Sequence, residues 1–350
     1  EDAAKGEPPA FVARERQLGW LDGYLQRSLA GQGRVLFVTG GPGRGKTALL
    51  AEFGRRAMEA HAGLLVASGN CNAYSGVGDP YLPFRDIMDM LSGDVERAWA
   101  AGVITRDHAR RLWSLLPYTA GALADRGPDL IDVFVSGSGL FKRAATAGAA
   151  GSADWLGQLQ NIAKRERPAP GDLEQPQLFE QYTQVLRILA AQRPLLLILD
   201  DLQWADTASI NLLFHLGRRV CESRILILGA YRPSEVALGR LSVDRGQEEQ
   251  HPLKPVINEF KRLFGDTHLD LRQATPAEDR EFVDVLLDTE PNRLEEDFRQ
   301  ALFRHTQGHP LFTVELIREM QERGDLIQDG EGRWIEGPSL VWDVLPARVE

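Results

Sequence analysis

Residues 40–47 of this 350-residue chain read GGPGRGKT, and this stretch decides the fold. The apolar run from Val35 to Val38 precedes it, and an amphipathic stretch from Ala48 to Ala60 follows it. A strand, a glycine-rich loop and a helix in this order are the context of a phosphate-binding P-loop. Gly40 and Gly45 would let backbone N–H groups turn inward onto a polyphosphate, and the helix start would add the positive end of its dipole. The flanking elements disfavour the alternative, an ordinary glycine turn before a helix.

Two side chains of the loop would complete this site. Lys46 would reach the β- and γ-phosphates, and the Thr47 hydroxyl would ligate Mg²⁺. We therefore expect a nucleoside triphosphate to bind here. The residues expected to line it are Gly41, Pro42, Gly43, Arg44, Gly45, Lys46, Thr47 and Ala48.

A second stretch, LLLILDDLQWAD at residues 195–206, predicts the metal side of the site. Its five aliphatic residues are typical of a central strand of a parallel sheet, buried on both faces. Asp200 and Asp201 would then lie at the carboxyl end of that strand, where ligands of open α/β sheets bind. We assign Asp200 to the metal and Asp201 to the attacking water. The alternative is that the paired carboxylates only start a loop and cap a helix near Ala205.

The remaining pattern alternates strands with helices, which predicts an α/β fold with a parallel sheet covered by helices on both faces. The predicted strands are Gly63–Ser68, Arg224–Tyr231 and His268–Leu271, and the predicted helices are 46–60, 176–192, 205–220 and 251–264. From Pro276 onward the pattern is helical, which predicts a domain boundary near 273. The predicted helices there are Ala277–Leu287, Leu294–Thr306 and Leu311–Arg323, and a β-hairpin follows around Gln328–Gly332.

The region from 93 to 175 gives the weakest signals. Val95–Leu116 is predicted to be helical, and Ser136–Ser152 is predicted to be a mobile loop because it is rich in Gly, Ala and Ser. The basic run Lys164–Arg167 fits a solvated helix end better than a phosphate or partner patch.

Composition narrows the class of protein. The formal net charge of −10 argues against direct nucleic-acid binding by this segment. Two cysteines without metal-ligand spacing suit a reducing compartment, and we expect a cytoplasmic protein. The apolar runs are too short to span a bilayer, so no membrane role is expected.

Five blocks taken together resemble the STAND class, signal-transduction ATPases with numerous domains that are related to AAA+ proteins. The blocks are FVARERQL at 11–18, the P-loop, LLLILDDLQWAD, LGAYRPSEV at 228–236 and TQGHPLFTVELI at 306–317. The chain is most similar to the bacterial branch of large LuxR-type and cyclase-associated regulators. The resemblance implies a linker at 1–10, a nucleotide-binding domain at 11–273 with a loosely matched insertion at 93–175, a helical lid at 274–324 and the start of a winged-helix unit at 325–350.

The resemblance also implies roles for particular residues. In relatives the first block lies against the adenine and ribose; Phe11, Val12 and Arg14 match it, whereas Ala13 stands where relatives have glycine. Arg232 resembles the sensor of the γ-phosphate, and Pro310 resembles the lid proline that packs on the adenine. Trp204 belongs to the same signature as the paired acids, and we expect it to be a packing residue.

These residues favour a regulatory ATPase switch, in which ATP and Mg²⁺ close the lid and slow hydrolysis releases it. The switch would act in signal transduction or transcription regulation, with regulatory protein partners or self-association. The alternative is an ADP-bound scaffold with little or no hydrolysis. A third hypothesis, a small-molecule phosphotransferase, lacks a base placed to activate a hydroxyl.

Overall fold

The computed structural model describes residues 13–72, 80–146, 157, 174–241, 248–342 and 345. The chain folds as two compact units. We call Trp20–Val38 with Phe53–Leu269 the sheet unit, and Glu1–Gly19, Thr39–Glu52 and Asp270–Glu350 the P-loop unit.

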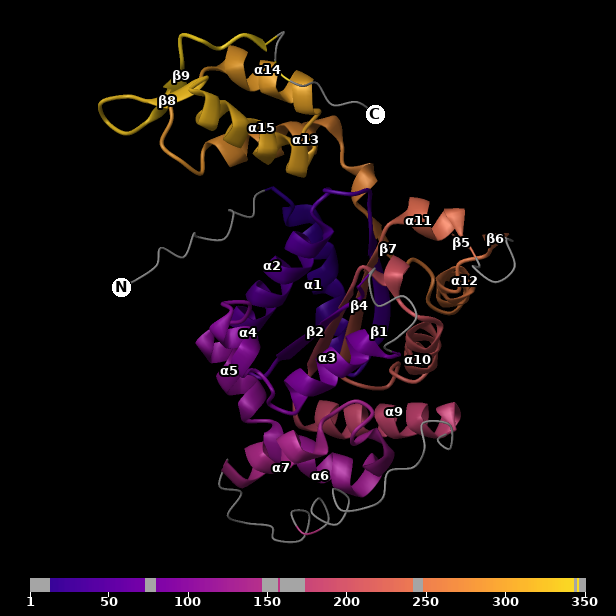
Figure 1. Cartoon of the computed structure of the whole chain (residues 1–350). Coiled ribbons are helices and arrows are strands. Elements are labelled where there is room, and N and C mark those ends of the chain that lie inside the picture. The colour runs from indigo at the N-terminus through magenta and orange to yellow at the C-terminus, as the bar shows by residue number, and fades with distance from the viewer. Residues whose placement is uncertain are drawn as a thin grey trace. The chain divides into compact units, whose positions relative to one another are not determined.

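The elements follow one another in the order shown in Figure 1. The helices up to the third strand are α1 (Glu15–Leu29), α2 (Lys46–Ala60), α3 (Leu82–Leu91), α4 (Glu96–Ala100), α5 (Arg106–Trp113), α6 (Leu116–Arg126), α7 (Gly137–Thr146) and α9 (Gln175–Gln192). The later helices are α10 (Thr207–Gly217), α11 (Pro233–Leu238), α12 (Leu253–Phe264), α13 (Pro276–Leu287), α14 (Glu296–Thr306) and α15 (Pro310–Arg323). Short 3₁₀ turns are η2 (Pro128–Leu130), η3 (Leu202–Trp204) and η4 (Leu271–Gln273). The strands are β1 (Arg34–Thr39), β2 (Leu65–Asn70), β3 (Leu195–Asp200), β4 (Ile225–Tyr231), β5 (Arg240–Leu241), β6 (Glu248–Glu249), β7 (His268–Asp270), β8 (Leu326–Gln328) and β9 (Trp334–Glu336).

A five-stranded parallel sheet with strand order β2-β3-β4-β1-β7 organises the sheet unit. Leu65 of β2 pairs with Leu195 of β3, which in turn pairs with Ile225 of β4. Helices flank this sheet (Figure 1), and its strands β3 and β4 are buried on both faces and consist almost entirely of aliphatic residues. The predicted α/β P-loop fold is therefore confirmed.

Aromatic packing on one side of the sheet shows how closely the helices approach. Phe260 of α12 is fully buried and stacks on Phe37 of β1, with ring centroids 6.2 Å apart. A Cβ at Gly217 of α10 would lie 2.2 Å from the Phe260 ring. Glycine at this position therefore allows α10 and α12 to pack closely.

Several sequence predictions for the sheet unit need correction. The second strand begins at Leu65 rather than Gly63, because Leu64 N–H still closes a turn onto His61 O (3.0 Å). The helix predicted over Val95–Leu116 is broken at Gly102, whose φ of +72° is left-handed. Thr105 then caps the next helix, α5.

The predicted loop over Ser136–Ser152 is also wrong in its described part, since Gly137–Thr146 forms α7. Leu140 and Ala144 lie one turn apart on the same face and are both buried. Burial of this face outweighs the low helix propensity of the glycines. The basic run Lys164–Arg167 lies outside the described residues.

The C-terminal part of the P-loop unit is helical, as predicted. Helices α13 to α15 and the antiparallel hairpin β8–β9 enclose a small core around Phe298, Leu302 and Met320. Thr275 and Glu278 form a capping box at the start of α13.

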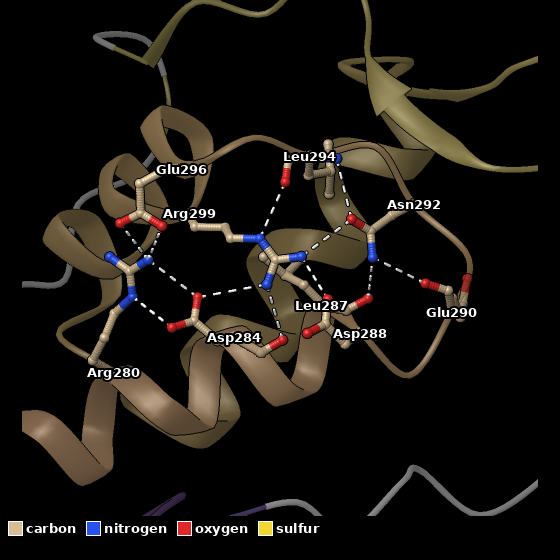
Figure 2. Close-up of polar contacts among 9 residues, drawn as sticks. All are labelled: Arg280, Asp284, Leu287, Asp288, Glu290, Asn292, Leu294, Glu296 and Arg299. Carbon is tan, nitrogen blue, oxygen red and sulfur yellow. Dashed lines mark hydrogen bonds and ion pairs between the residues drawn. The ribbon is translucent and has the colours of Figure 1, made fainter.

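Arg299 of α14 is the centre of a polar network in this unit (Figure 2). It donates to Asp284 O (3.2 Å), Asp288 Oδ1 (2.5 Å) and Leu294 O (3.1 Å), and so ties α14 to α13 and to the loop between them. Arg280 extends the network along α13, because its Nε and Nη2 donate to Asp284 Oδ2 (2.9 Å) and Oδ1 (3.1 Å).

Candidate functional site

The P-loop of residues 40–47 connects β1 to α2, as predicted, and α2 begins at Lys46. Gly43 (φ +67°) and Gly45 (φ +78°) are the residues that adopt left-handed backbone conformations. Gly40, which the sequence pairs with Gly45 as a residue that turns N–H groups inward, is not among the glycines with positive φ. A Cβ at Gly43 would also lie 2.6 Å from the Leu311 Cβ, so glycine is needed there for space as well as for φ.

Every carbonyl oxygen from Gly40 to Arg44 accepts a hydrogen bond from the P-loop unit itself. Lys46 Nζ donates to Gly40 O (3.1 Å) and to Gly41 O (3.0 Å). The start of α15 supplies the next two donors, with His309 Nε2 3.1 Å from Pro42 O and Leu311 N 3.2 Å from Gly43 O. Arg14 Nη2 donates to Arg44 O (2.8 Å).

This pattern determines where the amide groups of the loop point. In a trans peptide the N–H points away from the C=O of the same plane, and no cis peptide occurs among the described residues. The N–H groups of Gly41, Gly43, Arg44 and Gly45 therefore point away from the donors that hold the carbonyls. Amide groups of a glycine loop that precedes a helix start are the groups that bind an anion in such sites.

The hydrogen bonds of His309 define the tautomer of its ring. Its Nδ1 accepts from Phe312 N–H (3.4 Å) as the N-cap of α15, so the proton lies on Nε2, which faces Pro42 O. From the sequence, His309 could approach phosphate or solvent, or be a structural residue. Its hydrogen bond to the P-loop depends on where α15 lies. Pro310 is half-buried and is the first residue of α15, a position that suits its fixed φ.

The first block of the resemblance meets the P-loop through Arg14. Ala13 has a left-handed φ of +48°, a conformation that glycine adopts more easily than alanine. Arg14 Nη1 is buried without a hydrogen-bond partner among the described residues, so the site has a donor to spare for an anion or a base. Phe11 and Val12 lie outside the described residues.

The side chains that would meet phosphate and metal differ in exposure. Lys46 is 6% exposed, whereas Thr47 and Ala48 are exposed. Arg44 turns outward from the loop to Asp279 of α13 (3.6 Å). The buried Nη1 of Arg14, which has no hydrogen-bond partner among the described residues, and the amides of the glycine loop fit a polyphosphate.

The paired acids lie at the carboxyl end of β3 in the sheet unit, as predicted. Asp200 is the last residue of the strand, and its Oδ1 accepts from Asp201 N–H (2.8 Å). Asp201 adopts a left-handed conformation (φ 53°, ψ 41°), which Asp tolerates better than most residues. Neither acid caps the following helix, which was the alternative. Asp206 is the N-cap of α10, because its side chain accepts from Ser209 N–H (2.9 Å).

Arg232 follows β4, the neighbour of β3, and its Nη1 pairs with Glu235 Oε1 (2.9 Å). Its Nε is buried without a hydrogen-bond partner in the described part of the chain. Gln203, to which the sequence assigns no role, connects this residue to Asp201. Gln203 Nε2 donates to Asp201 Oδ1 (2.7 Å), and Gln203 Oε1 accepts from Arg232 N–H (3.1 Å).

Trp204 is 41% exposed, which argues against the prediction that it is a packing residue. The 3₁₀ turn η3 directs Leu202 and Gln203 inward, so the following residue points outward.

Comparison with known proteins identifies the fold family. Residues 10–228 match the AAA ATPase domain. The chain belongs to the AAA ATPase domain family. A AAA ATPase domain carries a P-loop, so the nucleotide-binding interpretation of residues 40–47 agrees with family membership.

Three individual proteins to which this AAA ATPase domain protein is similar share 30% or less of their sequence with it over the aligned residues. The DNA repair protein RecO of Pseudomonas entomophila is 30% identical over 195 residues, which are 54% of this chain and 76% of the relative. A signal-transduction ATPase with numerous domains and a tetratricopeptide repeat sensor from Pyrococcus horikoshii aligns in structure with a TM-score of 0.36 at 17% identity. That alignment covers 91% of this chain but only 34% of the other. A chain from Drosophila ORC bound to GC-rich DNA and Cdc6 gives a TM-score of 0.29 at 11% identity, over 95% of this chain and 94% of the other.

No helix among the described residues is long and apolar enough to cross a membrane.

Proposed function

We propose that this chain is a regulatory switch that binds ATP and hydrolyses it slowly. One observation supports this most: five consecutive P-loop carbonyls, from Gly40 to Arg44, are each held by a donor of the P-loop unit. The amides on the opposite side of the same peptides are thereby fixed before a ligand arrives. A preorganised anion site binds without the cost of ordering the loop.

The side chains have separate roles in this proposal. Lys46 binds the β- and γ-phosphates, while Thr47 and Asp200 hold Mg²⁺, which neutralises phosphate charge when bound. Asp201 orients the attacking water, and Arg232 contacts the γ-phosphate through its guanidinium. Arg14 and Pro310, with Phe11 and Val12, hold the nucleoside.

Two of the contacts to the P-loop come from the start of α15, which makes the lid part of the proposed switch. His309 and Leu311 bind carbonyls of the same peptides whose N–H groups would bind phosphate. A change in loop geometry between ATP and ADP would therefore alter the lid contacts directly. We infer a cytoplasmic regulator of the LuxR-type branch, acting in signal transduction or transcription regulation through protein partners or self-association.

Removing the cation of the loop tests nucleotide binding. Lys46→Ala should weaken ATP binding by about 2–5 kcal/mol, as for loss of one partner of a desolvated charge pair. Calorimetry measures the affinity, and Lys254→Ala on the exposed face of α12 serves as the control. Equal affinities for Lys46→Ala and Lys254→Ala would refute the phosphate site.

Hydrolysis separates the switch from the alternative, an ADP-bound scaffold. Asp201→Asn keeps the shape of the side chain but removes the charge that orients water. We expect the single-turnover rate of ATP hydrolysis to fall at least tenfold while ADP binding is retained. A wild-type rate that Asp201→Asn does not lower would favour the scaffold.

The similarity to DNA repair protein RecO favours a second candidate, a role in DNA repair. The net charge of −10 opposes it, because DNA affinity depends on neutralising phosphates. Titration of labelled single- and double-stranded DNA at several salt concentrations distinguishes the two candidates. Saturable binding that weakens steeply with salt would favour DNA repair, and its absence would favour the switch.

A further inference from the structure

We propose that Gln203 is a positioning residue that couples the water-orienting acid to the γ-phosphate sensor. This inference rests on the proposed function, because it takes Asp201 and Arg232 in the roles given above. Its basis is a single carboxamide that bonds to both residues at the carboxyl ends of β3 and β4.

The carboxamide uses its two ends for two different tasks. Its Nε2 lies 2.7 Å from Asp201 Oδ1, so one carboxylate oxygen is fixed. Asp201 Oδ2 has no hydrogen-bond partner among the described residues, which leaves that oxygen to accept from water. The Oε1 atom lies 3.1 Å from Arg232 N and holds the backbone from which the sensor guanidinium extends.

The surroundings hold Gln203 itself in place. It is only 2% exposed, and its backbone oxygen accepts from the Nε2 of His251 (2.9 Å), a side chain that is 1% exposed. The Nδ1 of His251 accepts from Leu253 N–H (3.1 Å), which fixes the Nε2–H tautomer. On the strand side, a Cβ at Gly229 of β4 would lie 2.6 Å from Leu202 Cδ1, so glycine lets η3 pack directly against β4.

This arrangement makes the acid and the sensor depend on one side chain. A shift of Arg232 toward or away from a phosphate moves its backbone N–H, and Gln203 transmits that shift to the Asp201 carboxylate. A buried polar bridge of this kind is costly to leave half-satisfied, so the two groups move together.

Two substitutions separate the two ends of the carboxamide. Gln203→Met keeps the length of the side chain and removes both hydrogen bonds. Gln203→Glu keeps an acceptor for Arg232 N–H but places a carboxylate against Asp201 in place of the donor. Gln181 of α9 is a matched control, because its carboxamide also makes two hydrogen bonds. Its Nε2 donates to Asp129 Oδ2 (2.7 Å), and its Oε1 accepts from Asp129 N–H (3.1 Å).

The measurements are the single-turnover hydrolysis rate and the ratio of ATP to ADP affinities. Gln203→Met should lower the hydrolysis rate at least tenfold, with ADP affinity within twofold of wild type. It should also lower the ratio of ATP to ADP affinity about as much as Arg232→Ala, the variant that lacks the γ-phosphate sensor. Gln203→Glu should lose hydrolysis but keep the affinity ratio. Gln181→Met should change neither quantity, although it removes the same two kinds of hydrogen bond.

The results that overturn the inference differ from those that overturn the proposed function. If Gln203→Met keeps both the rate and the affinity ratio within twofold of wild type, the coupling is absent and only this inference fails. Equal loss of the affinity ratio in Gln203→Glu and Gln203→Met also refutes it, because the Glu variant keeps the link to Arg232. If wild type hydrolyses too slowly to measure, the affinity ratio alone decides; if wild type binds no ATP, both proposals fail.

Discussion

The sheet unit and the P-loop unit differ in the balance between apolar and polar contacts. The largest fully buried side chains of the sheet unit are aromatic: Phe37, Phe84, Phe134, Tyr182 and Phe260. The helices of the P-loop unit enclose a smaller core and rely on arginine–carboxylate contacts centred on Arg299 (Figure 2). A rearrangement of helices α13 to α15 would therefore exchange polar contacts, whereas a rearrangement of the sheet would expose apolar surface to water.

Three carboxyl groups, Asp89, Asp288 and Glu278, illustrate this difference in their titration. Burial, with Asp94 nearby, raises the pKa of Asp89 in the sheet unit to about 6. In the P-loop unit the hydrogen bond from Arg299 lowers the pKa of Asp288, and the backbone N–H of Thr275 lowers that of Glu278. Lowering the pH thus favours the sheet unit through Asp89 and weakens the P-loop unit through Asp288 and Glu278.

Truncating the sheet core should have the largest effect. Phe260→Ala removes a fully buried ring and should lower the free energy of unfolding by about 3–5 kcal/mol. Denaturant unfolding measures this change, and Leu263→Ala on the same helix, at a residue 43% exposed, is the control. Similar effects of the two substitutions would show that α12 is not anchored by the aromatic cluster.

Disrupting the polar network of Arg299 tests the polar contacts of the P-loop unit. Arg299→Ala removes hydrogen bonds to Asp284, Asp288 and Leu294, and should cost about 1.5–3 kcal/mol. Hydrogen exchange should become faster in α13 and α14 and stay unchanged in β3 and β4. Arg304→Ala at an exposed site of α14 is the matched control, and equal exchange in both variants would contradict the network's role.

The contact between the P-loop and α15 can be tested at Gly43. Gly43→Ala introduces strain from a positive φ, about 1–2 kcal/mol, and a clash with Leu311. Gly31→Ala introduces the same strain in open space, because a Cβ there meets nothing within 4 Å. Only Gly43→Ala should speed hydrogen exchange at Leu311 and Phe312; equal exchange in the two variants would mean that the contact contributes nothing.

The smallest effect concerns Asp89 and depends on pH. Its pKa is about 6 in the folded chain, above the ordinary 3.8, so its charge destabilises the fold once the pH rises through 6. Asp89→Asn should therefore stabilise the protein at pH 8 by about 1 kcal/mol, allowing for partial exposure of the group. Melting curves from pH 8 to pH 4 should show this advantage shrink and vanish; an advantage independent of pH would contradict the titration.

The sequence predicts those features that depend on local pattern. The aliphatic run at Leu195–Leu199 was sufficient to place β3, and GGPGRGKT to place the loop and α2. The sequence does not predict contacts between segments that are distant along the chain. The left-handed φ at Gly43 rather than Gly40 accompanies the approach of Leu311, and the role of Gln203 depends on the pairing of β3 with β4. Composition also misled at Gly137–Thr146, where burial of Leu140 and Ala144 decides the helix.

The central claim is that the amides of the P-loop bind the phosphates of ATP. Selective ¹⁵N labelling of glycine allows the N–H groups of Gly41, Gly43 and Gly45 to be followed directly as ATP and Mg²⁺ are added. We predict saturable shifts of these three resonances that exceed those of Gly31 and Gly265, which lie in turns elsewhere with positive φ. Unchanged P-loop resonances alongside saturable shifts of other glycines would contradict the account.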